Sequence, residues 1–179
     1  MDAPPLRLAT LADAEAIETL MQASIADLFP AFYDARQTQS SIQHIGVADR
    51  VLIDDATYFV AEASRELVAC GGWSRRDKLY TGSGASGSDL RVLDPLTEPA
   101  RVRAMFVRSD WTRRGLGRRI LEACEAAAKA DGYRTLALMA TLPGVPLYTN
   151  YGFRERGRTA VTMPDGVSIA CLAMEKPVG

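Results

Sequence analysis

Four arginines and two glycines fall within a short stretch that could bind a multiply charged anion. Residues 113–119 read Arg-Arg-Gly-Leu-Gly-Arg-Arg, and the apolar spacing that follows predicts a helix over residues 115–130. Arginines at a helix start cost roughly a few tenths of a kcal/mol each, because the aligned peptide dipoles already place positive charge there. A bound anion makes arginines at this position favourable, and glycine lets backbone N–H groups approach the anion closely. We therefore expect an anion site here, and a diphosphate fits it.

The neighbouring segments predict a strand–helix–strand unit around this stretch. Residues 101–107 have the pattern of a strand, and residues 134–141 are continuously apolar, as in a strand buried on both faces. Two parallel strands joined by a helix form a right-handed crossover. A helix that follows a strand in this way is the context in which a helix start binds phosphate.

The remaining segments extend this unit into one α/β sheet. Further strands are predicted at residues 5–10, 57–63, 67–73, 154–162 and 167–174, and further helices at 11–28, 35–45 and 145–153. A long polar loop is expected over residues 74–99. The expected fold is a mixed, largely antiparallel sheet of about seven strands, with a central parallel βαβ unit and helices on both faces. We expect residues 1–179 to form a single domain.

A second glycine-rich stretch does not fit a nucleotide site. Residues 82–87 read Gly-Ser-Gly-Ala-Ser-Gly and match the dinucleotide fingerprint G-x-G-x-x-G. That fingerprint acts only between a strand and a helix, and here two prolines and no helical pattern follow it. We interpret it as a surface loop. The stretch at residues 113–119 lacks the G-K-[ST] of a Walker loop, which argues against nucleotide hydrolysis.

Composition and cysteine usage favour a cytoplasmic globular protein. Hydrophobic residues make up 47% and charged residues 24% of the chain, and no apolar run approaches the ~20 residues that span a bilayer. The first residues lack the pattern of a signal peptide. Cys70, Cys124 and Cys171 are far apart and show no metal-ligand spacing, and His44 alone cannot form a metal site. We therefore expect no metal and no membrane partner.

Charge is distributed unevenly along the chain. Residues 1–66 hold four arginines against eleven acids, whereas residues 101–119 hold seven arginines against one acid. The net charge is −1, no aromatic residue lies within the arginine cluster at residues 113–119, and Glu122 and Glu125 follow closely. These features argue against nucleic acid as a partner. The acidic half could favour a cation or could simply be solvated surface.

The motifs together resemble the central region of the GNAT superfamily of N-acetyltransferases. That family's turn R/Q-x-x-G-x-G/A is matched by residues 112–117, and its Y-x-x-x-G-F signature by residues 148–153. The resemblance implies acetyl-CoA as cofactor, bound through the turn and the arginines that follow it: Thr112, Arg113, Arg114, Gly115, Leu116, Gly117, Arg118 and Arg119. Thr112 departs from the usual Gln or Arg, and Arg113 could compensate.

The resemblance also implies roles in catalysis. The strand at Met105, Phe106 and Val107 would be splayed from its neighbour to bind the pantetheine arm, and an N–H at Phe106 or Val107 would steady the oxyanion. Tyr148 would be the general acid for the departing thiolate. Tyr151 is expected to pack, and Thr141 lies near the position of a cofactor-contacting Asn.

The base and the acceptor stay open at this point. Arg101 stands where some relatives place a glutamate, so the base could be Glu98, Asp94, Asp89 or a water chain. The acceptor would be a primary amine of a small molecule or peptide, and the acidic half would suit a cationic one. Candidate pocket residues are Phe29, Phe32, Tyr33, His44 and Trp73. A non-catalytic acyl-CoA-binding module is the alternative, and a homodimer is possible.

Overall fold

A seven-stranded mixed sheet organises the chain, as the sequence predicted. The computed structural model describes residues 4–78 and 91–179. The strands are β1 (Leu6–Leu8), β2 (Tyr58–Ala63), β3 (Glu66–Ser74), β4 (Ala100–Val107), β5 (Thr135–Thr141), β6 (Arg154–Thr162) and β7 (Ser168–Pro177). Their order is β1-β2-β3-β4-β5-β7-β6, and β4 with β5 is the parallel pair. The Gly82–Gly87 stretch and Asp89 lie outside the described residues.

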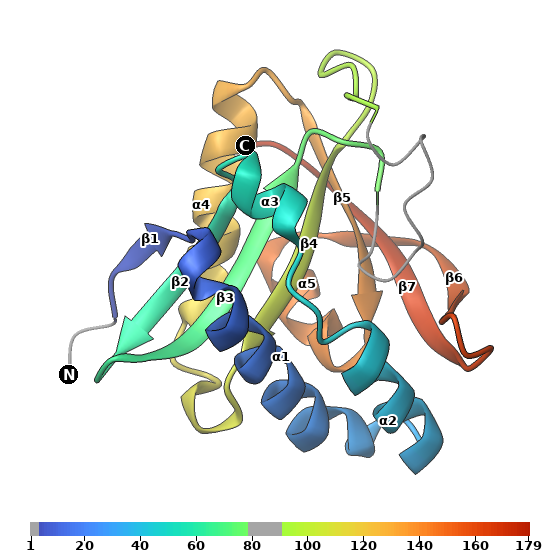
Figure 1. The fold of residues 1–179 in the computed structure, drawn as a ribbon. Coiled ribbons are helices and arrows are strands. Elements are labelled where there is room, and N and C mark those ends of the chain that lie inside the picture. Colours follow the sequence, from blue (N-terminus) through green and yellow to red (C-terminus); the bar gives the residue numbers. More distant parts are fainter. Residues whose placement is uncertain (1–3, 79–90) are drawn as a thin grey trace.

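Helices cover both faces of this sheet (Figure 1). They are α1 (Ala14–Leu28), α2 (Ala35–His44), α3 (Arg50–Asp54), α4 (Leu116–Ala130) and α5 (Val145–Tyr151). One core cluster packs α4 and α5 on the sheet, and two others pack α1, α2 and α3 on the opposite face. The apolar residues at helical spacing explain this, because each amphipathic helix turns its apolar stripe to the sheet. Within the two described ranges, no helix combines the length and apolar character that crossing a bilayer requires.

Helix α3 was not predicted from the sequence. It is five residues long, which is too short for a 3.6-residue period to stand out. Asp49 occupies its N-cap position, yet the Asp49 carboxylate makes no capping bond. It forms an ion pair with Arg103 of β4 instead, and the two side chains are 4% and 1% exposed. A buried pair of this kind ties α3 to the centre of the sheet, because separating the charges would leave one of them uncompensated in the core.

Candidate active site

Strands β4 and β5 pair at only two positions and then diverge. The paired residues are Ala100 with Leu136 and Arg101 with Ala137. Beyond them β5 follows β7, up to Thr141 opposite Cys171. An opening therefore forms in the middle of the sheet, where one edge of β4 has no strand beside it.

Some backbone N–H and C=O groups of β4 point into this opening. The N–H of Arg108 donates to Val68 O on β3, at 2.9 Å. Because backbone groups alternate in direction along a strand, the N–H and C=O of Val107 point to the other edge, and those of Met105 do likewise. Val107 O accepts a 2.9 Å bond from Ser24 Oγ of α1, which agrees with this direction. The N–H groups of Met105 and Val107 thus face the opening.

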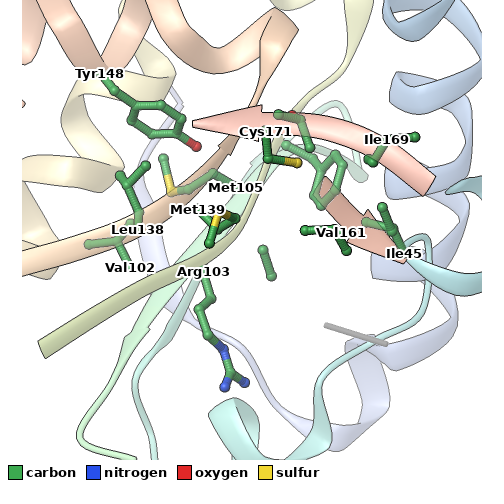
Figure 2. A pocket seen from close by; sticks show the side chains of 13 residues that line it. Ile45, Val102, Arg103, Met105, Leu138, Met139, Tyr148, Val161, Ile169 and Cys171 are labelled. Carbon is green, nitrogen blue, oxygen red and sulfur yellow. The ribbon is translucent and has the colours of Figure 1, made fainter. Parts of the chain in front are cut away.

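A cavity of about 70 Å³ occupies the opening and passes through the sheet. On the α4/α5 side its wall includes Val102, Leu138 and Tyr148, which belong to the core cluster of those helices. On the α1/α2 side its wall belongs to a different cluster. Figure 2 shows Leu138 and Tyr148 on one side of the space and Ile45, Val161 and Ile169 on the other. The residues on the α1/α2 side are Ile45, Phe106, Met139, Val161, Ile169 and Cys171.

A bulge in β4 lies beside the cavity. Cys70 pairs with Phe106 and Gly72 with Arg103, so β4 contains one residue more than β3 over this interval. Ala104 within it has φ +54°, a left-handed conformation that costs a non-glycine residue about 1–2 kcal/mol. Such strain persists only where surrounding contacts impose it.

Buried polar side chains from the N-terminal half impose this conformation. The hydroxyl of Tyr58, a residue with no exposed surface, donates to Ala104 O at 2.9 Å. The adjacent Arg103 is held by Asp49. Arg103 and Ala104 are therefore each held by a buried side chain of the N-terminal half. Their conformation determines the direction of the β4 backbone at Met105, the next residue.

Tyr148 projects from α5 into the cavity (Figure 2). It is 8% exposed, and its ring packs edge-on against Phe153 with centroids 5.9 Å apart. Burial raises the pKa of the Tyr148 phenol above its ordinary value, so the hydroxyl holds its proton at neutral pH. The nearby Tyr151 points elsewhere and donates to Glu125 at 2.6 Å, in agreement with a packing role.

The turn before α4 contains two residues in the left-handed region of backbone conformation. Arg113 and Gly115 have φ values of +61° and +80°, and space around Gly115 is open. The first intrahelical bond runs from Arg119 N–H to Gly115 O, so the N–H groups of residues 116–118 precede it and lack a partner four residues back. These N–H groups carry the positive end of the α4 dipole.

The four arginines of this stretch divide into two pairs. Arg113 and Arg114 are exposed at the turn, where Arg114 stacks on the Trp111 ring at 4.5 Å. Arg118 pairs with Glu122, and Arg119 donates to the Pro4 carbonyl. The first pair therefore lies in the exposed turn before the helix, whereas the second pair lies in the first turn of α4 and is engaged with Glu122 and Pro4.

Gly117 has a packing role that the sequence did not indicate. A Cβ at this buried position would lie 2.8 Å from Leu147 Cδ2. Leu147 precedes Tyr148 on α5. The glycine thus permits α4 and α5 to approach, and this approach places Tyr148.

The aromatic residues that the sequence predicted for an acceptor pocket lie around the cavity and not in its wall. Phe29 and Tyr33 are buried and pack together at 5.2 Å. Phe32 is 51% exposed, and Trp73 packs against Tyr133 in the α4 core. His44 lies 3.5 Å from Asp165. Strand alternation in β5 and β7 is the signal that could have identified the wall residues instead.

The upstream carboxylates considered as a base are engaged elsewhere. The Arg91 guanidinium, 2.6 Å away, lowers the pKa of Glu98 to about 2. Asp94 accepts bonds from Leu96 and Thr97 in its own turn. Neither residue lines the cavity, and a carboxylate of such low pKa is a weak proton acceptor. Thr141, by contrast, does line it.

Comparison with known proteins identifies a family and a fold. Residues 54–155 match the model described as "Acetyltransferase (GNAT) domain". A GCN5-related N-acetyltransferase of Rhodopseudomonas palustris is 19% identical, with a TM-score of 0.75 over 99% of this chain and 97% of that one. No curated protein matches the chain in sequence.

Two further structures with this fold were solved with a cofactor. The PaiA N-acetyltransferase of Thermoplasma acidophilum, in complex with coenzyme A, is 14% identical with a TM-score of 0.64, over 99% of both chains. The YncA protein of Salmonella typhimurium, with acetyl-CoA, is 14% identical with a TM-score of 0.63, over 99% of this chain and 95% of that one. At such identities the similarity shows the fold alone.

Removal of the Tyr58 hydroxyl should loosen the bulge selectively. Tyr58→Phe loses one buried hydrogen bond, worth about 1–1.5 kcal/mol, so amide hydrogen exchange of residues 105–107 should become about tenfold faster. Tyr133→Phe is the matched control, because it loses a comparable bond to Leu93 O at 3.1 Å away from the bulge. Equal exchange at residues 105–107 in the two variants would show that Tyr58 does not hold the bulge.

Proposed function

The chain belongs to the GNAT family of N-acetyltransferases, and from this premise we propose that it transfers the acetyl group of acetyl-CoA to a primary amine of a small molecule or peptide. One observation carries the proposal. The cavity at the β4/β5 opening brings the unpaired strand edge at Met105 together with the buried hydroxyl of Tyr148, and α4 on that face of the sheet begins with N–H groups that precede its first intrahelical bond.

The turn before α4 fits the diphosphate of coenzyme A. Open space at Gly115, free N–H groups at residues 116–118 and the exposed guanidinium of Arg113 provide donors and positive charge in one place. The Thr112 hydroxyl donates a hydrogen bond to Ser109 O. Arg113 would therefore make the diphosphate contact that Gln or Arg usually makes at the first position of the turn. Arg114, Leu116, Gly117, Arg118 and Arg119 would complete this cofactor site.

The β4 edge and Tyr148 would act on the reacting groups. Acetyl-CoA, when bound, supplies a thioester whose acyl carbon an amine can attack directly. The N–H groups of Met105 and Val107 can donate to an oxygen that gains negative charge in the opening. Phe106 contributes its side chain to the wall, because its backbone lies on the β3 side. Tyr148 Oη holds a proton that it can give to a leaving thiolate.

The amine would lose its proton to water and not to a carboxylate. In the part of the chain that the structure describes, the cavity wall contains no Asp, Glu or His. A primary amine has an ordinary pKa near 10.4 and is mostly charged at pH 7. Of the alternatives that the sequence left open, a water chain is therefore the one that this wall supports.

Loss of the Arg113 side chain should weaken cofactor binding. Arg113→Ala removes a charge-assisted contact at an exposed site, so we expect acetyl-CoA to bind about fivefold more weakly in calorimetric titration, with a weaker salt dependence. Arg158→Ala is the control, since its side chain is 84% exposed on β6. Wild-type protein should prefer acetyl-CoA over NAD and ATP, and absence of acetyl-CoA binding would refute the proposed function.

Replacement of Tyr148 should slow the chemical step. Tyr148→Phe should lower kcat by about 10²-fold, the usual contribution of a general acid, and leave the KM for acetyl-CoA within about twofold. Tyr151→Phe loses a hydroxyl bonded to Glu125 outside the cavity and should keep wild-type kcat. A fully active Tyr148→Phe enzyme would exclude the acid role. Binding without transfer to any amine would favour the non-catalytic module.

The pH dependence should follow the substrate. Since the phenol pKa of Tyr148 is raised, its proton is retained throughout neutral pH and beyond, and its ionisation does not limit the rate below about pH 10. We expect log kcat/KM to increase with unit slope from pH 6 to about the pKa of the amine. A plateau that begins near pH 7 for amines of different pKa would instead reveal an enzyme base.

A further inference from the structure

The two sides of the cavity differ in chemistry, and this difference bears on the acceptor. The α4/α5 side holds Tyr148 and lies on the face of the sheet covered by α4, whose start is the proposed anion site. If the donor occupies that side, as the proposed function requires, the second reactant must approach from the α1/α2 side. The wall on that side therefore selects the acceptor.

This wall is formed by apolar side chains from separate elements. Ile45 follows α2, Val161 belongs to β6 and Ile169 to β7, while Phe106 and Met139 come from the two diverging strands. Val161 and Ile169 are 5% and 1% exposed, so they are held in place by the core. An apolar group of a substrate is stabilised against such a wall, at roughly 25 cal/mol per Å² removed from water.

The charged groups near this wall are already paired. The carboxylate of Asp49 is bound to Arg103, whose side chain lines the cavity on β4 (Figure 2). Asp165 accepts a 2.6 Å bond from Ser40 and lies 3.5 Å from His44. A second ammonium group on the substrate would lose water here, and the wall offers it no carboxylate in return.

We infer that the acceptor is a primary amine carried on an apolar chain or ring, with no second positive charge close to it. This inference rests on the proposed function and narrows it. On charge alone, the acidic residues 1–66 would suit a cationic acceptor amine. The inference replaces that expectation with an amine whose only positive charge is its own ammonium group.

A matched pair of amines tests this inference. Hexylamine and hexane-1,6-diamine have the same length and differ by one ammonium group. With saturating acetyl-CoA and CoA release as the measured rate, kcat/KM for hexylamine should exceed that for the diamine by at least tenfold. Equal rates, or a faster diamine, would overturn the inference.

A carboxylate placed in the wall should reverse the preference. Ile45 is half-buried at the wall, so Ile45→Glu should raise the diamine-to-monoamine ratio of kcat/KM at least tenfold, with the KM for acetyl-CoA unchanged. Ile42→Glu is the matched control, because Ile42 is half-buried in the last turns of α2, three residues before Ile45, but does not line the cavity. A ratio that changes equally in both variants would contradict the assignment of this wall.

The remaining outcomes separate this inference from the proposed function. If hexylamine is inert while polar amines or peptide N-termini release CoA, the inference is wrong and acetyl transfer stands. If acetyl-CoA does not bind to the protein, with or without an amine present, the inference and the proposed function are both wrong.

Discussion

The divergence of β4 and β5 is the constraint on which the rest of the structure depends. A central strand normally forms hydrogen bonds to a neighbouring strand along both edges. Strand β4 stops pairing with β5 after Arg101. The structure holds the two strands apart from both sides. On β4, Asp49 and Tyr58 fix the bulge at residues 103–104. On β5, the Tyr33 hydroxyl accepts from Leu142 N–H and donates to Ala170 O, which keeps the end of β5 beside β7. Together these contacts hold apart two strands whose backbone groups could otherwise bond to each other.

Part of the uneven charge of the sequence is compensated on folding. Acids of the N-terminal half meet arginines from distant segments, as in the pairs Asp55–Arg76, Asp49–Arg103 and Glu66–Arg108. An exposed pair such as Glu66–Arg108 contributes about 0–1 kcal/mol, and the three pairs together offset part of the opposite local balances. The acidic half therefore presents less free charge than its composition indicates. The turn at Arg113 and Arg114 differs, because these exposed side chains precede a helix start whose positive dipole end would stabilise a bound anion.

Local patterns predicted most of the fold, whereas the site depends on long-range pairing. The crossover formed by β4, α4 and β5 could be predicted because strand pattern, glycine turn and helical spacing agree within 41 consecutive residues, 101–141. Helix α3 could not, because it is too short for periodicity and Asp49 there bonds to Arg103 and not to the helix. The cavity wall was predicted in part. Met105, Phe106 and Tyr148 line it as expected, whereas its residues from β5, β6 and β7 come together only through long-range strand pairing. Composition led instead to Phe29, Tyr33 and Trp73, which do not line the cavity.

Burial alone could prepare both reacting groups for the proposed chemistry. Desolvation disfavours the charged form of any group, so it raises the pKa of a phenol and lowers that of an amine. At the β4/β5 cavity the first effect keeps Tyr148 protonated, in the form that can donate. The second would favour a neutral amine, the form that can attack, wherever the amine contacts the apolar wall of Ile45, Val161 and Ile169. A wall without a carboxylate is then consistent with acid–base chemistry, because a carboxylate would stabilise the ammonium form that the reaction must avoid.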